Sequence, residues 1–493
     1  MDPQIWQDLA RFRPEIILSA SFLAVVLVDI SWPRAPRATL WVAAAGLAAA
    51  FVASLGLIDA PEGGLFFGMV ALDRQAVFFK GFLLLASFLV LLAAPGSREL
   101  SRAHLGEFYA LLLGVTLGML LLASSTDLLM LYLSLEMVSV ASYIMVGYLR
   151  ADRQSNEASL KYILFGAVST GSMLYGITLL FGLTGSTNLH AIQKALVAGA
   201  GSGANALTLL VATALLLAGF GFKTAAVPFH FWCPDVYTGA PTPVTAFLSV
   251  APKAAGFATL VRFFFSGLTD PAGTAGGAPL SVFDWSYLLL LVSIVTMTLG
   301  NVAALRQENL KRMLAYSSIA HAGYMFMGAV VVTSEGLQAI LIYLITYLFM
   351  NLGAFLVVIE IYNRTGSFDL GDYRGLYRRS PFLACAMTIF LLSLMGIPPF
   401  AGFFGKLFVF GAAVNRNLAW FAAVGALNSV IAVYYYARVI RAMVIDPAQD
   451  ATAIQLPWSS VALVWIMLLP TIGMSLVWDR IQRLTGGAWK LFS

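Results

Sequence analysis

Charged residues are scarce in this sequence, and their scarcity excludes most soluble classes of protein. Only 11% of the 493 residues are charged, 60% are hydrophobic, and the mean hydropathy is +0.85. Soluble domains are roughly half apolar and about a quarter charged. A water-soluble fold of this size would therefore lack the polar surface needed to cover its core. We expect an integral membrane protein whose surroundings are the lipid bilayer.

Cysteine and histidine are also rare, with 2 and 4 residues respectively. Cys233 and Cys385 stand far apart, and no CxxC pair is present to hold zinc or an iron–sulfur cluster. We therefore expect no cofactor and no metal in this chain. The net charge of +5 comes from basic residues scattered singly between apolar stretches, so we expect no nucleic acid as a partner.

Long uncharged runs predict about fourteen transmembrane helices. About 20 apolar residues in a helix cross the hydrocarbon layer while every backbone group stays hydrogen-bonded within the segment. The predicted spans are 16–32, 39–58, 76–94, 108–125, 128–149, 158–183, 205–236, 241–266, 286–305, 311–332, 336–361, 381–412, 417–440 and 458–478. The predicted fold class is an all-α polytopic membrane protein.

The basic residues near the ends of the spans predict the orientation. Loops after odd-numbered spans hold fifteen Lys and Arg, among them Arg34 and Arg102, whereas loops after even-numbered spans hold five, among them Lys80 and Arg262. Short cytoplasmic loops are enriched in Lys and Arg. We therefore place the odd-numbered loops in the cytoplasm of a bacterial inner membrane and both termini on the periplasmic side.

Two of the spans are too long and too interrupted to be simple helices. The seventh contains Pro228 and Pro234, and the twelfth contains Pro398 and Pro399. A proline removes one amide donor and frees a carbonyl, so a break at membrane depth survives only where protein or trapped water satisfies the loose groups. Such breaks mark ion pathways in many transporters.

The spacing of the two breaks predicts an internal repeat. The seventh and twelfth spans differ by five, an odd number, so equivalent spans would cross the bilayer in opposite directions. We expect two inverted five-helix repeats between an N-terminal three-helix segment and a last helix. The predicted segments are 1–106, 107–267, 284–444 and 445–493.

Ionisable residues inside the spans are the candidate functional residues, because each costs about 2.5 to 3.5 kcal/mol near the bilayer centre on insertion scales. The main candidates are Glu136, Lys223, Lys253 and Lys406. Lys161 and His321 lie nearer the ends of their spans and are accessory candidates.

Three deep lysines against one deep carboxylate leave a surplus of positive charge, so at least one lysine should release its proton near neutral pH. Such a lysine is a proton carrier, and Glu136 beside Lys223 would control when it holds its proton. Two alternatives to this proton-carrying role stay open. In the first, Glu136 and a lysine form an ion pair that only holds helices together. In the second, His321 is a hydrogen-bonded packing residue.

The residues around these lysines carry a resemblance to a known family. The stretch GFGFKTAAVPFHFWCPDVYTGAPTPVTAFLSVAPKAAGFATLVRF resembles the signature of the antiporter-like subunits of respiratory complex I. Further matches are SLEMVSVASYIMVGY, EASLKYILFGAVSTG, NLKRMLAYSSIAHAGYMFMG and GIPPFAGFFGKLFVF, which appear in the expected order over residues 136–410. Lys406, where subunit M typically has glutamate, and the lack of the long lateral helix of subunit L make the chain most similar to the subunit N branch.

The resemblance implies a proton path through Glu136, Lys223, Lys253 and Lys406, with Lys161 as an accessory cation. It also implies that NADH, FMN, iron–sulfur clusters and quinone bind elsewhere in the complex, and that subunits M and K are the neighbours in the membrane arm. Two other functions remain as alternatives at this point. One is a subunit of a multisubunit sodium/proton antiporter, and the other is a structural spacer of the membrane arm.

Overall fold

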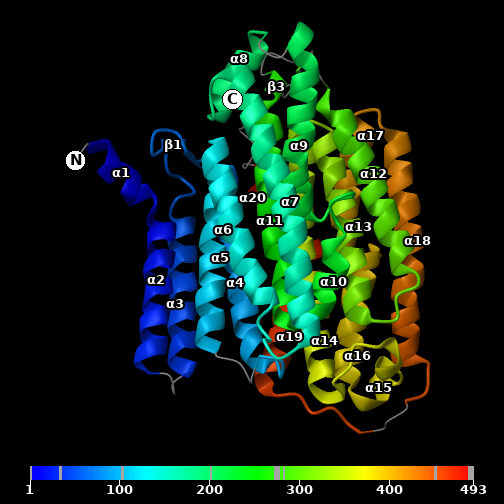
Figure 1. Cartoon of the computed structure of the whole chain (residues 1–493). Coiled ribbons are helices and arrows are strands. Elements are labelled where there is room, and N and C mark those ends of the chain that lie inside the picture. The colour runs from blue at the N-terminus through cyan, green and yellow to red at the C-terminus, as the bar shows by residue number, and fades with distance from the viewer. Residues whose placement is uncertain are drawn as a thin grey trace.

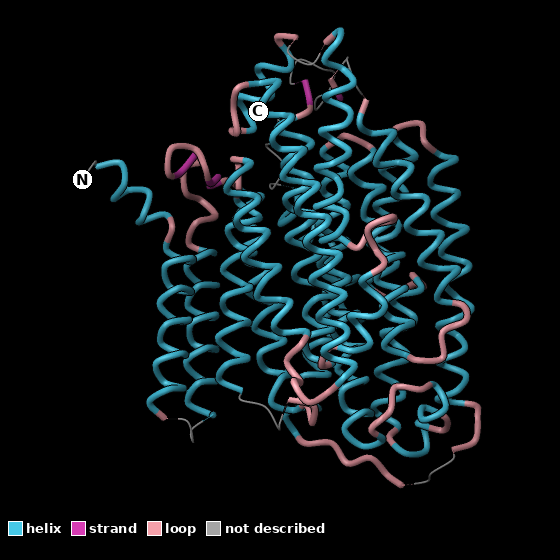
Figure 2. Tube along the Cα trace, in the orientation of Figure 1, coloured by secondary structure: helices cyan, strands magenta, loops and turns pink. Residues whose placement is uncertain are grey.

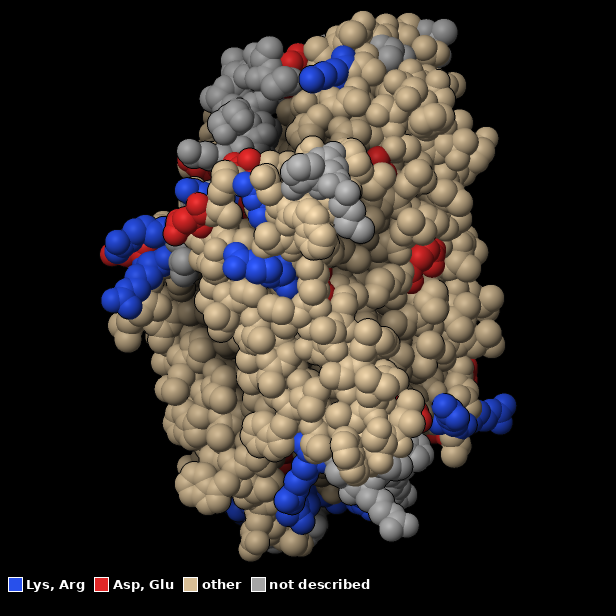
Figure 3. Space-filling view, turned by 90° about the vertical axis from the view of Figure 1, so that its left-hand side faces the viewer, with Lys and Arg blue, Asp and Glu red and all other residues tan. Residues whose placement is uncertain are grey.

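The computed structural model describes residues 3–32, 36–100, 105–199, 202–270, 278–280, 284–448 and 452–486. Arg34 and Arg102, two of the arginines that predict the orientation, lie outside the described residues. The described chain is a bundle of long helices with most axes running along one direction (Figures 1 and 2). On the face in Figure 3, charged side chains are few and stand in small groups, with large uncharged areas between the groups.

The first half of the described chain contains two short hairpin strands and eleven α-helices. These are α1 (Pro3–Arg11), α2 (Arg13–Ser31), α3 (Pro36–Leu55), β1 (Gly63–Leu65), β2 (Val70–Leu72), α4 (Arg74–Ala93), α5 (Leu105–Ser124), α6 (Leu128–Val146), α7 (Arg153–Thr184), α8 (Leu189–Val197), α9 (Ala206–Thr224), α10 (Trp232–Gly239) and α11 (Thr242–Gly267). Strands β1 and β2 pair antiparallel.

The second half begins with a two-residue antiparallel pair and continues with nine described α-helices. These are β3 (Thr269–Asp270), β4 (Ala278–Pro279), α12 (Trp285–Ala304), α13 (Leu310–Val330), α14 (Ser334–Thr365), α15 (Leu376–Arg379), α16 (Pro381–Met395), α17 (Ala401–Asn415), α18 (Ala419–Val444), α19 (Trp458–Gly473) and α20 (Trp478–Gly486). Four short 3₁₀ turns lie between the helices of the two halves, at Ala94–Gly96, Gly203–Asn205, Leu370–Tyr373 and Met474–Val477.

The prediction of an all-α polytopic membrane protein is confirmed. Twelve described helices are long and apolar enough to cross a membrane. The tenth predicted span is α13, which has 21 residues, and the twelfth is the pair of shorter apolar helices α16 and α17. Each of the fourteen predicted spans therefore corresponds to helix in the structure. Helices α1 and α20 both lie toward the end of the bundle that carries α8 (Figure 1).

Both predicted breaks are present, and one of the four prolines was misjudged. The first break separates Thr224 from Trp232, and the second separates Met395 from Ala401. Pro234 was expected to interrupt the first of these spans, but it lies in the first turn of α10. The first four amides of a helix have no intrahelical partner, so a proline there costs no hydrogen bond. Each break contains one cis peptide bond before a proline, at Pro228 and Pro399.

The two inverted repeats are visible in matching helix lengths and matching turns. Helices α5 and α12 each have 20 residues, α7 and α14 each have 32, and α11 and α18 each have 26. After α7 the chain forms a bridge between Asp127 and Asn188, and after α14 it forms the same bridge between Asn309 and Asp369. Figure 1 shows α8 and α15, which follow these turns, at opposite ends of the bundle. The division into four segments stays a prediction.

Close packing of α12 on α13 depends on two glycines. A Cβ atom added at Gly323 would lie 2.5 Å from the backbone nitrogen of Met297, and one added at Gly300 would lie 2.6 Å from that of Ala320. Real side chains cannot approach backbone atoms so closely. Small residues let membrane helices pack at short distance, where dispersion and weak hydrogen bonds hold them together.

We expect Gly323→Leu to weaken this helix pair, because overpacking a tight site costs about 1–3 kcal/mol or more. The measurement is the thermal stability and yield of the purified protein in detergent. Gly411→Leu is the matched control, since Gly411 is also helical and an added Cβ there meets nothing within 4 Å. Equal stability of the two variants would contradict this account of the packing.

Candidate site of buried lysines

Lys223 lies in the last turn of α9, directly before the first break. Its side chain is 2% exposed, and its Nζ donates a hydrogen bond to the hydroxyl of Ser139 on α6 at 2.9 Å. The aliphatic part packs against α11, where a Cβ added at Gly256 would lie 3.2 Å from the Cβ of Lys223. Among the described residues, no carboxylate lies within ion-pair distance of this lysine. Its Nζ also lies 5.7 Å from the ring centre of Phe222, and the residue belongs to the last turn of α9, where the helix dipole is negative.

Glu136 lies on α6, three residues before Ser139, which is a rise of about 4.5 Å along the helix. It is partly exposed on an outer face of α6, where Leu133, Met137 and Val140 are exposed too. Glu136 therefore lies about one turn along α6 from the serine that binds Lys223, and the described structure has no ion pair between Glu136 and Lys223. The chain leaves this carboxylate on an apolar surface.

Lys253 lies in the middle of α11, directly after Pro252. It is 1% exposed, and its Nζ donates to the backbone oxygen of Ser318 on α13 at 2.6 Å and to the Ser318 hydroxyl at 2.5 Å. Pro252 has no amide, so the carbonyl one turn earlier loses its helical donor. The predicted span 241–266 contains this proline, and the structure keeps the segment as one helix, α11.

His321 follows Ser318 by one turn of α13 and is fully enclosed. Its Nδ1 lies 2.8 Å from the hydroxyl of Tyr343 on α14, and its Nε2 lies 3.3 Å from the hydroxyl of Tyr436 on α18. Tyr436 in turn shares a 2.5 Å hydrogen bond with Ser317. The imidazole thus joins hydroxyl groups from two helices, α14 and α18, to α13.

Lys406 lies in α17, one turn after the second break. It is 4% exposed, its Nζ donates to the backbone oxygen of Met395 at 2.8 Å, and it lies 4.9 Å from the ring centre of Tyr324. Met395 is the last residue of α16, so this ammonium also occupies the negative end of a half-helix. A Cβ added at Gly396 would lie 2.8 Å from the Cδ of Lys406, so the side chain needs a glycine there.

Polar side chains continue from the lysines toward α18. Asn301 on α12 donates to the hydroxyl of Tyr324 at 3.0 Å and accepts from the hydroxyl of Tyr435 at 3.0 Å. The ring of Tyr324 therefore contacts Lys406, while its hydroxyl belongs to the network of Asn301. Together with His321 and Tyr436, these groups line the space between Lys253 and Lys406.

Several buried polar atoms near Lys253 have no hydrogen-bond partner in the described structure. They are the hydroxyls of Tyr237 and Tyr347 and the side-chain oxygen of Asn351. The amide nitrogen of Asn351 donates at 2.6 Å to Ser249, four residues before Lys253. Buried polar groups are normally satisfied by protein or by ordered water. These atoms therefore mark positions for internal water.

Lys161 lies apart from the other lysines. Its Nζ is 2.8 Å from Glu157 and 2.8 Å from Asp235, and Asp235 also binds Arg312 at 2.7 Å. All four side chains are at least 31% exposed. The accessory lysine thus belongs to an ion-pair group that ties α7 to α10 and α13.

Sequence reasoning misplaced two buried cations and overlooked their partners. Lys80 and Arg262 were counted as loop residues, but both lie inside helices, with exposures of 0% and 2%. Each stands within an apolar run that was itself predicted as a span, 76–94 and 241–266, and that position was the signal. Lys80 pairs with Glu15, and Arg262 pairs with Asp73.

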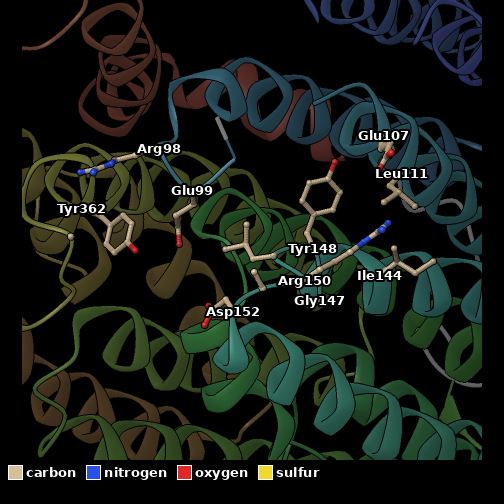
Figure 4. Close-up of a pocket in the computed structure, with 13 residues that line it drawn as sticks. Arg98, Glu99, Glu107, Leu111, Ile144, Gly147, Tyr148, Arg150, Asp152 and Tyr362 are labelled. Atoms are coloured by element: carbon tan, nitrogen blue, oxygen red, sulfur yellow. The ribbon is translucent and has the colours of Figure 1, made fainter. Parts of the chain in front are cut away.

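A cavity of about 900 Å³ opens at the opposite end of the bundle from α8. Its lining carries charges of both signs, with Arg98, Glu99 and Tyr362 on one side and Arg150, Tyr148 and Glu107 on the other (Figure 4). The carboxylate of Glu99 accepts from the first amide of α11, at Thr242, at 2.7 Å. Within the described ranges, no three His, Cys, Asp or Glu residues come together as metal ligands.

We expect ordered water at the unpartnered atoms of Tyr237, Tyr347 and Asn351, because leaving each one unsatisfied costs about 1–3 kcal/mol. A high-resolution cryo-electron microscopy map of the protein in lipid checks this directly. The hydroxyl of Thr213, which donates to Leu209 within α9, serves as the internal control without a water partner. A map without water density beside any of the three atoms would contradict the expectation.

Comparison with known proteins places this arrangement in a family. Residues 125–432 match the family model described as NADH:quinone oxidoreductase/Mrp antiporter, transmembrane. The chain is 45% identical over 500 residues to NADH-quinone oxidoreductase subunit N of Anaeromyxobacter sp., covering 98% of this chain and 96% of that one.

Solved structures agree with the sequence match. A chain of respiratory complex I from Thermus thermophilus has a TM-score of 0.79 at 33% identity, covering 96% of this chain and 100% of that one. A chain of the Mrp complex from Dietzia sp. has a TM-score of 0.84 at 21% identity, with 98% of each chain covered, and this likeness shows the fold alone. The chain therefore belongs to the antiporter-like family of membrane subunits, and within it to the subunit N family of NADH-quinone oxidoreductase.

Proposed function

We propose that this chain carries protons across a bacterial cytoplasmic membrane as a non-redox subunit of a proton-translocating NADH:quinone oxidoreductase. One observation carries the proposal. Lys223, Lys253 and Lys406 are each at most 4% exposed, and hydroxyl and carbonyl oxygens, with no carboxylate, hold their ammonium groups. An ammonium without a carboxylate partner is costly inside a membrane bundle. A small change in the charges or hydrogen bonds around such a lysine can therefore shift it between its charged and neutral forms.

Glu136 is the proposed control element for Lys223. It is partly exposed on the apolar outer face of α6, about one turn from the hydroxyl that binds Lys223. A neighbouring subunit that packs on this face would bury Glu136 and change its interaction with Lys223. We propose subunits M and K as the neighbours in the membrane arm, with one of them on this face.

The route from Lys253 to Lys406 passes through side chains that both donate and accept hydrogen bonds. Lys253 binds Ser318, His321 lies one turn further along α13, and its ring nitrogens contact Tyr343 and Tyr436. Each hydroxyl and the imidazole can pass on one proton and take up another. Lys406 receives the proton at the second break, where Met395 offers a free carbonyl.

Lys161 is the accessory group in this proposal, because it holds α10 in place through Asp235 and does not face the other lysines. NADH, FMN, iron–sulfur clusters and quinone are assigned to other subunits of the complex, and this chain is driven by coupling to them. Both termini are proposed to lie on the periplasmic side, which is then the side toward which α1, α8 and α20 lie.

The alternative function is that of a subunit in a multisubunit sodium/proton antiporter. The likeness in fold to a chain of the Mrp complex keeps it open. Co-purification separates the two functions. Flavin and iron–sulfur subunits purifying with the chain support the first, and small membrane partners alone support the second.

We expect Lys223→Met and Lys406→Met each to lower proton uptake and quinone reduction together while the complex stays assembled, because methionine keeps the volume of the side chain and removes the exchangeable proton. Both rates are measured in inverted membrane vesicles. Lys194→Met is the matched control, since Lys194 is exposed at the end of α8. A structural spacer would keep its coupled proton flux in all three variants, and that result would overturn the proposal.

A further inference from the structure

A second group of buried charges lies outside the lysine series, where the N-terminal helices meet α11. It consists of Glu15 on α2, Lys80 on α4, Asp73 directly before α4, and Arg262 on α11. We call these four residues the N-terminal charge cluster. The mechanism proposed above uses none of them, and buried ionisable groups at membrane depth call for a reason.

Glu15 and Lys80 form an ion pair that is closed off from solvent. The carboxylate oxygen and the ammonium nitrogen are 2.7 Å apart, and both side chains are 0% exposed. Beyond this contact, neither group has a hydrogen-bond partner in the described structure. A carboxylate has about four acceptor sites and an ammonium has three donors. Most of this hydrogen-bonding capacity is therefore free for water.

Asp73 and Arg262 connect the pair to the membrane face that carries α8. Both carboxylate oxygens of Asp73 accept from the guanidinium, at 2.6 and 3.0 Å, and Asp73 keeps 21% of its surface exposed. Burial alone would raise the pKa of Asp73, but the charge and hydrogen bonds of Arg262, with help from Lys80, hold it below the usual value. Asp73 thus stays ionised in its ion pair with Arg262, and the charge of Lys80 adds a smaller contribution.

One member of the cluster, Arg262, lies on the same helix as Lys253, toward the end of α11. Arg262 follows Lys253 by nine residues, a distance of about 13.5 Å along α11. Two polar side chains lie between them. Gln75 donates to the backbone oxygen of Ala258 on α11 at 3.2 Å, and its own side-chain oxygen has no partner in the described structure. Thr259, on α11 itself, donates to Ala255 at 2.7 Å and to Leu122 on α5 at 3.2 Å.

We propose that Glu15 and Lys80 form a second acid–base site, which takes protons between Lys253 and the membrane face carrying α8 through bound water. In the elementary step the N–H bond of the Lys80 ammonium breaks and an O–H bond forms on Glu15, which leaves a neutral amine and a carboxylic acid. Glu15 then gives its proton to water near Asp73, and Lys80 regains one from water on the side of Gln75. This inference rests on the proposed function, because it assumes that Lys253 exchanges protons.

A purely structural pair would have the same position and a different response to substitution. An ion pair that only holds α2 to α4 can be replaced by apolar residues of similar volume with little loss, or with a gain, in stability. A pair that exchanges protons cannot be replaced in this way, because apolar side chains carry no exchangeable proton. The experiment therefore compares Glu15→Leu combined with Lys80→Met against the exchanged pair, Glu15→Lys combined with Lys80→Glu. Both variants are studied in the whole complex in inverted membrane vesicles.

We expect the apolar pair to assemble normally and to lose coupled proton uptake, and the exchanged pair to recover part of it. Assembly is checked by the yield of intact complex and by quinone reduction in the presence of an uncoupler. Proton uptake unchanged in the apolar pair would overturn the inference. If the apolar pair fails to assemble, a high-resolution map of the unmodified complex decides, because a cluster without bound water between Glu15, Lys80 and Gln75 would overturn it too.

The lysine variants distinguish failure of this inference from failure of the proposed function. Loss of proton uptake in Lys223→Met with normal uptake in the apolar pair would refute the second site alone. Normal uptake in both would refute the proposed function of the chain.

Discussion

An ammonium group enclosed in a membrane-spanning bundle needs hydrogen-bond acceptors, and for the three central lysines these acceptors are uncharged oxygens. Much of the surrounding structure follows from this constraint. Lys223 uses a serine hydroxyl, Lys253 uses a serine hydroxyl and carbonyl, and Lys406 uses the last carbonyl of a half-helix. Such acceptors stabilise the charged form less than a carboxylate would. Because burial disfavours the charged form and no carboxylate is paired with these three lysines, we propose that their neutral form stays accessible.

The helix breaks supply hydrogen-bond acceptors for the buried lysines. Each break ends a helix inside the bundle and so supplies carbonyl groups and a negative dipole end at a depth where lipid offers none. Lys223 is in the last turn of α9, and Lys406 reaches the last residue of α16. The inverted repeat places these two ends in opposite directions, so one chain presents similar sites toward both faces of the membrane. Glu136 is partly exposed on the outer face of α6, about one turn from the serine that binds Lys223.

Hydropathy and charge are local properties, so the sequence predicted the helices and the enclosed position of Lys223, Lys253 and Lys406. The role of these lysines stays a prediction. The sequence did not predict which groups meet. Ser318 is 65 residues from Lys253, and Tyr436 is 115 residues from His321, so these contacts arise only from packing. Lys80 and Arg262 were misplaced because loop counting ignored that their partners, Glu15 and Asp73, lie on other elements. Pro234 was misjudged because its effect depends on where a helix begins.

Direct observation of the charge on the buried lysines tests the central claim. Lysine labelled with ¹⁵N on the side chain, with Lys→Met variants for assignment, reports each Nζ by nuclear magnetic resonance in lipid. We predict that at least one of Lys223, Lys253 and Lys406 changes between ammonium and amine between about pH 6 and pH 9, below the usual range for lysine of about 10.4. Three lysines that remain ammonium over that whole range would contradict the account.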